Sequence, residues 1–247
     1  MNKIAIIGGT GLTSLAGVEI TETREVETPY GSPSNALSFG TFGDKEIIFL
    51  ARHGDPHTIQ PHKINYRANI HALKENGVEN IIAVNAVGGI TPEMHPGRIV
   101  IPEQIIDYTY GRKHTFFEDK LDEVTHIDFT NPYSVDLREQ LTSNPVILDL
   151  NVFVGGVYAA TQGPRLETAA EVDKLEKDGC DIVGMTGMPE TALARELNIN
   201  YVCLSLVVNW AAGKSDEEIT INMIEKHLAA GIGRVKAILE EAIKSIS

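Results

Sequence analysis

Short apolar runs rich in β-branched residues recur along the chain, and glycine, proline or polar residues bound each of them. Runs of this length are typical of strands that are buried on both faces, whereas helices need longer periodic segments. The runs predict strands at 4–7, 47–50, 81–87, 99–106, 152–160, 182–185 and 201–208.

Apolar residues three or four positions apart lie between several of these runs and predict amphipathic helices over roughly 61–76, 166–178 and 189–197. A long C-terminal helix is predicted from the same spacing of Leu228, Ile232, Val235, Leu239, Ile243 and Ile246. The alternation predicts an α/β fold, with a central mixed or parallel sheet flanked by helices in a single domain over 1–247. The segment 107–147 is poor in either pattern.

The composition describes a folded protein that carries a strong negative charge. Of 247 residues, 43% are hydrophobic, and the formal net charge of −13 disfavours nucleic acid or an acidic membrane surface as a partner. A small anion must therefore be bound by a local pocket. We expect a cytoplasmic protein, because Met1-Asn2-Lys3 does not open an export signal, no run is long enough to span a bilayer, and the two cysteines lie in or beside apolar runs.

Glycine-rich and polar segments follow several predicted strands, at the carboxyl ends where α/β sheets bind ligands. Gly8-Gly9-Thr10-Gly11-Leu12 follows the first strand and offers backbone N–H groups and a hydroxyl to an anion. A dinucleotide fingerprint would need glycine at Ser14, and the phosphate-loop lysine is also missing. A phosphate site and a simple tight turn are equally compatible with this segment.

Ala51-Arg52-His53-Gly54 follows the second predicted strand and places a permanent cation at its end. Arg52 could bind phosphate oxygens as a fork, or could form an ordinary surface ion pair. His53, His57 and His62 have a spacing that invites a metal, but Pro56 and Pro61 break any helix that would align them, so we expect no metal.

Two further segments lie at the carboxyl ends of predicted strands. Asn85-Ala86-Val87-Gly88-Gly89 leaves backbone N–H groups open to a ligand. Thr161-Gln162-Gly163-Pro164-Arg165-Leu166-Glu167-Thr168 places a carboxylate near a helix start, where Glu167 could bind a ligand or merely complement the helix dipole.

The last two segments also combine a strand end with polar groups. Gly184-Met185-Thr186-Gly187-Met188-Pro189-Glu190 enters a helix and suits an anion through its N–H groups and the Thr186 hydroxyl, while Met185 could simply be a core residue. Asn209 ends the last predicted strand, where its amide could bind a ligand or cap a turn.

The order of GGTGL, ARHG, NAVGG, TQGPRLET, VGMTGMPE and LVVN resembles the trimeric purine nucleoside phosphorylases and, within them, the methylthioadenosine phosphorylase branch. Asn65-Tyr66-Arg67-Ala68-Asn69 belongs to the same pattern, and the resemblance covers nearly the whole chain. It implies phosphorolysis, in which inorganic phosphate attacks the anomeric carbon of a purine nucleoside and releases the base and a sugar 1-phosphate. Phosphate is then a co-substrate, and no cofactor is needed.

The resemblance also implies roles for individual residues. The phosphate positions match Thr10, Arg52, His53, Thr186 and the backbone of Ala86.

The other matching positions bind the nucleoside. By this resemblance, Met185 is expected to lie against the ribose, Glu167 and Asn209 to contact the purine, and His126 to reach the 5′ end of a nucleoside held by a neighbouring subunit of a homotrimer. Arg52, Glu167 and Asn209 are the expected catalytic residues, since in the transition state positive charge forms on the ribose beside the phosphate and negative charge forms on the departing purine.

The chain departs from the 6-aminopurine enzymes at the base. Members of the family that this chain resembles and that act on 6-aminopurines carry aspartates at the positions of Asn209 and Ala211. The pair of Asn209 and Glu167 resembles the one used for 6-oxopurines, with Glu167 accepting from N1–H. We therefore expect hypoxanthine or guanine as the base.

The 5′ side also departs from the inosine and guanosine enzymes, which offer a histidine from the helix after the purine-binding strand. The comparable stretch, 219–224, is mostly apolar and would favour a methylthio group, unless Ile221 and Ile224 only face the core. The expected substrate is S-methyl-5′-thioinosine, cleaved to hypoxanthine and 5-methylthioribose 1-phosphate. The alternatives are a phosphorylase for inosine and guanosine, one for methylthioadenosine, a non-catalytic nucleoside-binding protein and a dinucleotide-dependent oxidoreductase.

Overall fold

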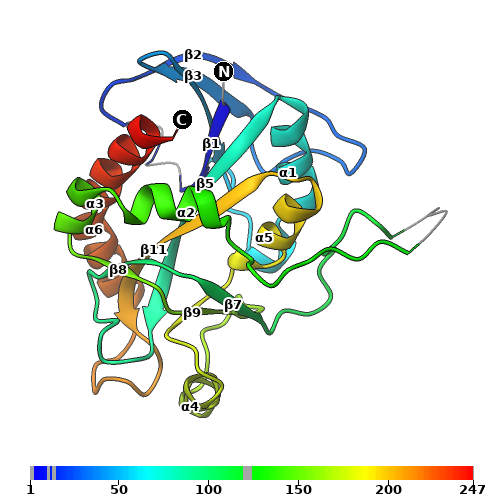
Figure 1. The fold of residues 1–247 in the computed structure, drawn as a ribbon. Helices are drawn as coiled ribbons and strands as arrows, with labels where there is room; N and C mark the ends of the chain where they lie inside the picture. The colour runs from blue at the N-terminus through cyan, green and yellow to red at the C-terminus, as the bar shows by residue number, and fades with distance from the viewer. Residues whose placement is uncertain (1–2, 10–11, 13–14, 119–123, 247) are drawn as a thin grey trace.

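A mixed sheet forms the centre of the protein, and helices cover both of its faces (Figure 1). The computed structural model describes residues 3–9, 12, 15–118 and 124–246. Its strands are β1 (Lys3–Gly8), β2 (Val18–Arg24), β3 (Leu37–Phe42), β4 (Lys45–Ala51), β5 (Val78–Gly89), β6 (Ile99–Ile101), β7 (Gln104–Asp107), β8 (Val152–Val154), β9 (Val157–Ala160), β10 (Ile182–Gly184) and β11 (Asn200–Trp210). Its helices are the 3-10 turn η2 (Pro61–Lys63) and α1 (Tyr66–Glu75), α2 (Val135–Thr142), α3 (Pro145–Asp149), α4 (Ala169–Lys177), α5 (Gly187–Glu196) and α6 (Ile221–Ser245). The predicted α/β fold with a mixed sheet is confirmed.

The strands read as continuous apolar runs because both faces of the sheet are buried. In β1, Ile4 and Ile6 pack in the core that α2, α3 and α6 cover, whereas Ala5 and Ile7 pack in the core under α1 and α5. A smaller core forms where α4 packs on β9 and β10 through Val172.

Strand β5 lies at the centre of the sheet. It pairs with β1 in parallel along its first half, with β11 in parallel along its whole length, and with β10 in antiparallel fashion at Gly88 and Gly89. Since β10 runs backwards along β5, its carboxyl end returns to the level of Val87. The loop after β10 therefore lies beside the middle of β5 and not beyond its end.

Two predicted strands are each broken into two, which corrects the expectation for 99–106 and 152–160. The breaks lie side by side, because the N–H of Gly155 donates to Ile101 and the N–H of Glu103 donates to Gly156. Gly155 and Gly156 adopt φ of 111° and 90°, which a β-branched residue could not sustain. The first halves, β6 and β8, pair with each other, and β6 also pairs with β11. The second halves, β7 and β9, pair with each other, and β9 also pairs with β10.

Several elements were not apparent in the apolar pattern. The hairpin of β2 and β3 was missed because β2 is exposed along almost all of its length, so no buried face marks it. The short helices α2 and α3 lie in the segment 107–147 that showed no clear period. The predicted helix over 61–76 is η2 followed by α1, which begins after Asn65 accepts a hydrogen bond from the N–H of Ala68.

Candidate active site

A cavity of about 530 Å³ lies where β1, β4, β5, β10 and β11 end or bend, and the first turns of α6 line one side of it. This volume is in the range of sites for small organic molecules. Its lining combines a region with a cation and a hydroxyl, a region with amide and carboxylate groups, and a wall that is mostly apolar.

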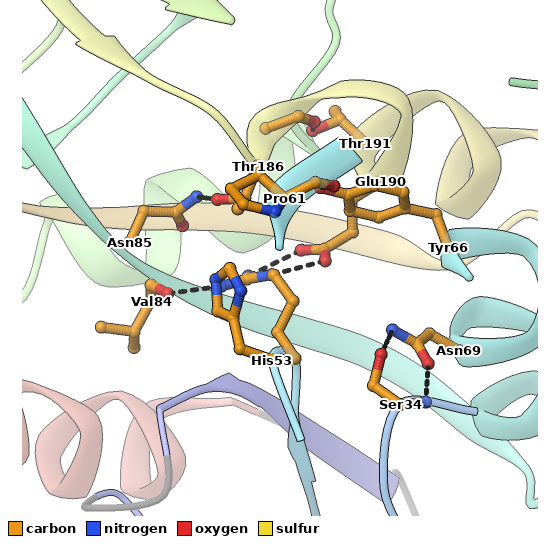
Figure 2. A network of polar contacts seen from close by, with 12 residues as sticks. Ser34, His53, Pro61, Tyr66, Asn69, Val84, Asn85, Thr186, Glu190 and Thr191 are labelled. Atoms are coloured by element: carbon orange, nitrogen blue, oxygen red, sulfur yellow. Dashed lines mark hydrogen bonds and ion pairs between the residues drawn. The ribbon is translucent and has the colours of Figure 1, made fainter. Parts of the chain in front are cut away.

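The cation of the first region is Arg52, which follows β4 and is only 2% exposed. Its Nε and Nη2 donate to the two carboxylate oxygens of Glu190 at 2.7 and 2.8 Å, and its Nη1 donates to the carbonyl of Val84 at 2.9 Å (Figure 2). Burial disfavours the charge of the guanidinium, but the carboxylate of Glu190 more than offsets this and raises the Arg52 pKa above its ordinary value. Arg52 is thus a fixed cation at every accessible pH.

His53 lies next to this cation and is held as a neutral imidazole. Burial, and then the charge of Arg52, lower the pKa of His53 to about 4, although the contact of its Nδ1 with the carbonyl of Ile59 favours the charged form. That contact is 2.8 Å long, and because a carbonyl only accepts, Nδ1 carries the hydrogen. The ring stacks on His57 with 4.3 Å between ring centroids. The other nitrogen, Nε2, is therefore an acceptor.

Thr186 comes to the same region because β10 runs antiparallel to β5. Asn85 of β5 donates from Nδ2 to the Thr186 hydroxyl at 2.6 Å, so the hydroxyl hydrogen remains available to another acceptor (Figure 2). Ala86 follows Asn85 and also lines the cavity. A hydroxyl near a cation suits an anion.

The amide of the second region is Asn209, which a β-bulge places in the cavity. The register of β11 on β5 slips between Val207 and Asn209, so that Asn209 lies opposite Gly88. Bulges beside a site redirect a side chain in this way. The Nδ2 group of Asn209 donates to the carbonyl of Trp210 at 2.7 Å, which leaves one N–H and the amide oxygen for a ligand.

Glu167 and Met185 line the same cavity. The Thr161 hydroxyl donates to one carboxylate oxygen of Glu167 at 2.6 Å and so fixes the direction of the side chain. The second carboxylate oxygen can accept from a ligand.

The apolar wall comes mainly from α6 and the loop before it. Ile219, Ile224 and Leu228 line the cavity together with Leu206 and Val208 of β11, and Glu225 is the charged residue that α6 adds to the same lining. Ile224 is therefore a pocket residue, whereas Ile221 is 68% exposed and neither lines the cavity nor faces the core.

The structure brings together most of the residues that the sequence singled out. Those that line the cavity are Arg52, His53, Ala86, Glu167, Met185, Thr186 and Asn209. Thr10 lies outside the described residues. His126 is exposed and does not line the cavity of its own chain.

Sequence reasoning missed the buried groups behind the cavity. Glu190 appeared in the sequence only as the last residue of a motif, and no local pattern links it to Arg52, which is 138 positions away. Arg112 lies in the segment without a clear pattern, yet its guanidinium donates to the carbonyls of Thr161, Gln162 and Met185 at 3.1, 2.8 and 2.9 Å. It thereby ties the loop before Glu167 to the loop that carries Thr186.

The described residues contain no cluster of three or more histidine, cysteine, aspartate or glutamate side chains with the geometry of a metal site. Within the described part of the chain, no helix has the length and apolar character needed to cross a membrane.

Residues 3–244 match the family model of the phosphorylase superfamily. A protein of Pseudomonas syringae named probable S-methyl-5′-thioinosine phosphorylase is 56% identical over 245 residues, which are 99% of this chain and 100% of that protein. The 6-oxopurine nucleoside phosphorylase of Pyrococcus furiosus is 47% identical over 225 residues, 89% of this chain and 84% of its own. The solved structure of methylthioadenosine phosphorylase from Schistosoma mansoni in complex with adenine is similar with a TM-score of 0.92 at 32% identity, covering 99% of this chain and 91% of its own.

Proposed function

The chain belongs to the phosphorylase superfamily, and from this premise we propose that it cleaves S-methyl-5′-thioinosine with inorganic phosphate to give hypoxanthine and 5-methylthioribose 1-phosphate. The protein is a pentosyltransferase of the nucleoside phosphorylase type. The observation that carries the choice of substrate is the pairing of Asn209 with an apolar α6 wall in one cavity.

The base is a 6-oxopurine because of the groups at its edge. Asn209 and Glu167 line the cavity and can donate to N7 and accept from N1–H respectively, and Ala211 brings no carboxylate to accept from an exocyclic amine. Adenine has no N1–H, so the carboxylate of Glu167 would lose its donor and face the lone pair of N1 instead. Such a mismatch can discriminate by roughly 10⁴.

The 5′ group is a methylthio group because Ile219, Ile224 and Leu228 offer it an apolar surface. Burying a hydroxyl against such a wall without a partner costs roughly 1–3 kcal/mol, while each buried methylene contributes about 0.8 kcal/mol. The wall thus favours methylthioinosine over inosine.

Phosphate binds beside Arg52, His53, Thr186 and the backbone of Ala86, with Thr10 as a further expected contact. Arg52 and the Thr186 hydroxyl donate to its oxygens. The bare Nε2 of His53 accepts from a protonated phosphate oxygen, which suits the hydrogen phosphate ion.

In the reaction, a phosphate oxygen attacks C1′ while the bond from C1′ to N9 breaks and its electron pair passes to the purine. Positive charge builds on the ribose ring, beside the anionic phosphate and against Met185. Negative charge builds on the purine, where the N–H of Asn209 donates to N7. The protein therefore acts by positioning the two reactants and by stabilising both charges, without a metal or an organic cofactor.

The second candidate is a phosphorylase for inosine and guanosine. The relative from Pyrococcus furiosus, named a 6-oxopurine nucleoside phosphorylase, favours it, and the same Asn209 and Glu167 would serve. The apolar α6 wall argues against it.

The deciding experiment compares kcat/KM for methylthioinosine, methylthioadenosine, inosine and guanosine at saturating phosphate, with Asn209→Asp as the matched variant. We expect methylthioinosine to be the best substrate of the wild-type protein. In Asn209→Asp, we expect kcat/KM for methylthioadenosine to rise relative to kcat/KM for methylthioinosine. Best use of inosine would establish the second candidate. Best use of methylthioadenosine would contradict the role of Asn209.

We further propose a homotrimer in the cytoplasm. His126 is exposed on the segment around 108–130, whose described parts project from the body of the protein (Figure 1). Tyr110 and Val124 on this segment are 72% and 76% exposed, and apolar side chains that face solvent in this way favour a subunit contact. Both cysteines are free and buried, which fits a reducing compartment.

A further inference from the structure

The cation of the proposed phosphate site is held from behind. A guanidinium has five N–H groups, and three of those of Arg52 are used by described acceptors, two by Glu190 and one by Val84. One N–H on each terminal nitrogen remains. Arg52 lines the cavity, so these two groups are the ones that can reach an anion there.

Glu190 is wholly buried, with 0% of its surface exposed, and it is satisfied by protein donors alone. Besides the two contacts from Arg52, its Oε1 accepts from the Tyr201 hydroxyl at 2.8 Å. Glu190 belongs to α5, whereas Arg52 follows β4 and Tyr201 belongs to β11, so donors from two other elements hold the carboxylate in one place.

We propose that Glu190, oriented by the Tyr201 hydroxyl, is the positioning residue of the phosphate site: it fixes the Arg52 guanidinium so that its two remaining N–H groups face the anion. This inference rests on the proposed function. It gives Glu190 no contact with substrate.

The charge of Glu190 makes the sign of its effect informative. As a charge, Glu190 cancels Arg52 and weakens the attraction for phosphate, so a purely electrostatic role predicts tighter phosphate binding when it is removed. As a positioning group, it provides a two-point contact that a glutamine cannot reproduce, because one amide N–H would face an N–H of Arg52. Positioning therefore predicts weaker binding.

The test measures KM for phosphate and for methylthioinosine in Glu190→Gln and Tyr201→Phe. We expect the phosphate KM to rise about tenfold or more in the first variant, in line with the loss of a charge-assisted contact, and about threefold in the second. The methylthioinosine KM should change by less than about twofold in both. The rise in Tm that phosphate induces should shrink in parallel, which gives a readout independent of turnover.

Tyr133→Phe is the matched control. Tyr133 is buried like Tyr201 and stacks on it with 6.3 Å between ring centroids, but its hydroxyl has no hydrogen-bond partner among the described residues. Its removal should leave the phosphate KM unchanged. Tyr201→Phe with this control decides the question even if Glu190→Gln does not fold.

An unchanged or lower phosphate KM in Tyr201→Phe and in folded Glu190→Gln would overturn the inference, as would an equal effect of Tyr133→Phe. Absence of phosphate-dependent base release by the wild-type protein would instead contradict the proposed function, and the phosphate-induced Tm shift would then test the positioning role alone.

Discussion

Asn209 and Arg52 stabilise different charges in the proposed reaction, so their variants should fail in different ways. Asn209→Ala removes the donor to the leaving purine, and we expect kcat to fall roughly 10²–10³-fold with the phosphate KM changed less than about threefold. Arg52→Lys keeps the charge but loses the fork, and should mainly raise the phosphate KM. Lysine is preferable to alanine here because alanine would leave Glu190 buried without a counter-charge. Equal, modest effects on both parameters would contradict this division.

His53 makes a prediction about stability and pH. Its pKa is about 4 in the folded protein against an ordinary 6.5, so the unfolded chain binds more protons between these values. The contribution of His53 to the free energy of unfolding is therefore fully present above about pH 6.5, and it is lost as the pH falls toward about 4. In phosphate-free buffer, His53→Gln should flatten the fall of Tm in this range.

His95→Gln, at an exposed histidine elsewhere, is the control for that measurement. A fall in Tm that is equally steep in wild type and His53→Gln would show that other groups govern the acid side.

At this scale, sequence reasoning works when chemistry is tied to a local motif. Asn209 was singled out because it ends an apolar strand, and the structure places it in the cavity. Glu190 was not, because it is only the last residue of a motif whose other members already suit an anion. Its partner is distant in sequence, and pairing over such a span depends on the packing of α5 against β11 and on where β4 ends.

At the scale of elements, the bulge in β11 and Gly88 of β5 determine where Asn209 lies, while the next residue, Gly89, allows the close approach of Met94. A Cβ on Gly88 would be 3.3 Å from the Nδ2 of Asn209, whereas one on Gly89 would be 1.7 Å from the backbone oxygen of Met94. Gly88→Ala should fold, shift the amide and lower kcat roughly tenfold or more. Gly89→Ala should be strongly destabilised, because backbone cannot give way. Tm and kcat of both variants check this, and a fully active Gly88→Ala would contradict the role of the amide.

In the proposed function, helix α6 determines the preference for the 5′ group. The inosine and guanosine enzymes that the chain resembles offer a histidine from this helix, and Ile224 is the cavity residue of its first turn. Ile224→His should raise kcat/KM for inosine relative to methylthioinosine, since it gives the 5′-hydroxyl a partner. Ile221→His, at an exposed position on the same turn, is the control and should change the ratio little. An unchanged ratio in Ile224→His would mean that α6 does not face the 5′ group.

Elements with a regular pattern of buried apolar residues were predictable from the sequence, and elements without such a pattern were not. The core strands were found because both faces are apolar, but the breaks after Ile101 and Val154 depend on hydrogen bonds between two distant segments. Nor could the antiparallel direction of β10 be predicted, since a short apolar run has no direction of its own. That direction brings Thr186 to Asn85.

At the scale of the whole molecule, the proposed homotrimer would bring the exposed His126 to the nucleoside of a neighbouring subunit. Light scattering should give three times the chain mass of 26.9 kDa. Co-expression of His126→Ala with Arg52→Lys should yield mixed trimers more active than either parent, because a pocket with intact Arg52 can receive an intact His126 from its neighbour. A monomer, or no recovery in the mixture, would contradict this arrangement.

Strand β5 borders β1, β10 and β11 and itself contributes Asn85 and Ala86 to the cavity. In the proposed reaction, the backbone of β5 therefore sets the distance between the nucleophile and the leaving group. Inserting a single residue in this strand would shift them by about 3.3 Å and turn every following side chain to the other face. To change the nucleoside specificity of the protein, this strand should be left unchanged and α6 should be varied, because in the proposed function its residues reach the sugar substituent from outside the sheet.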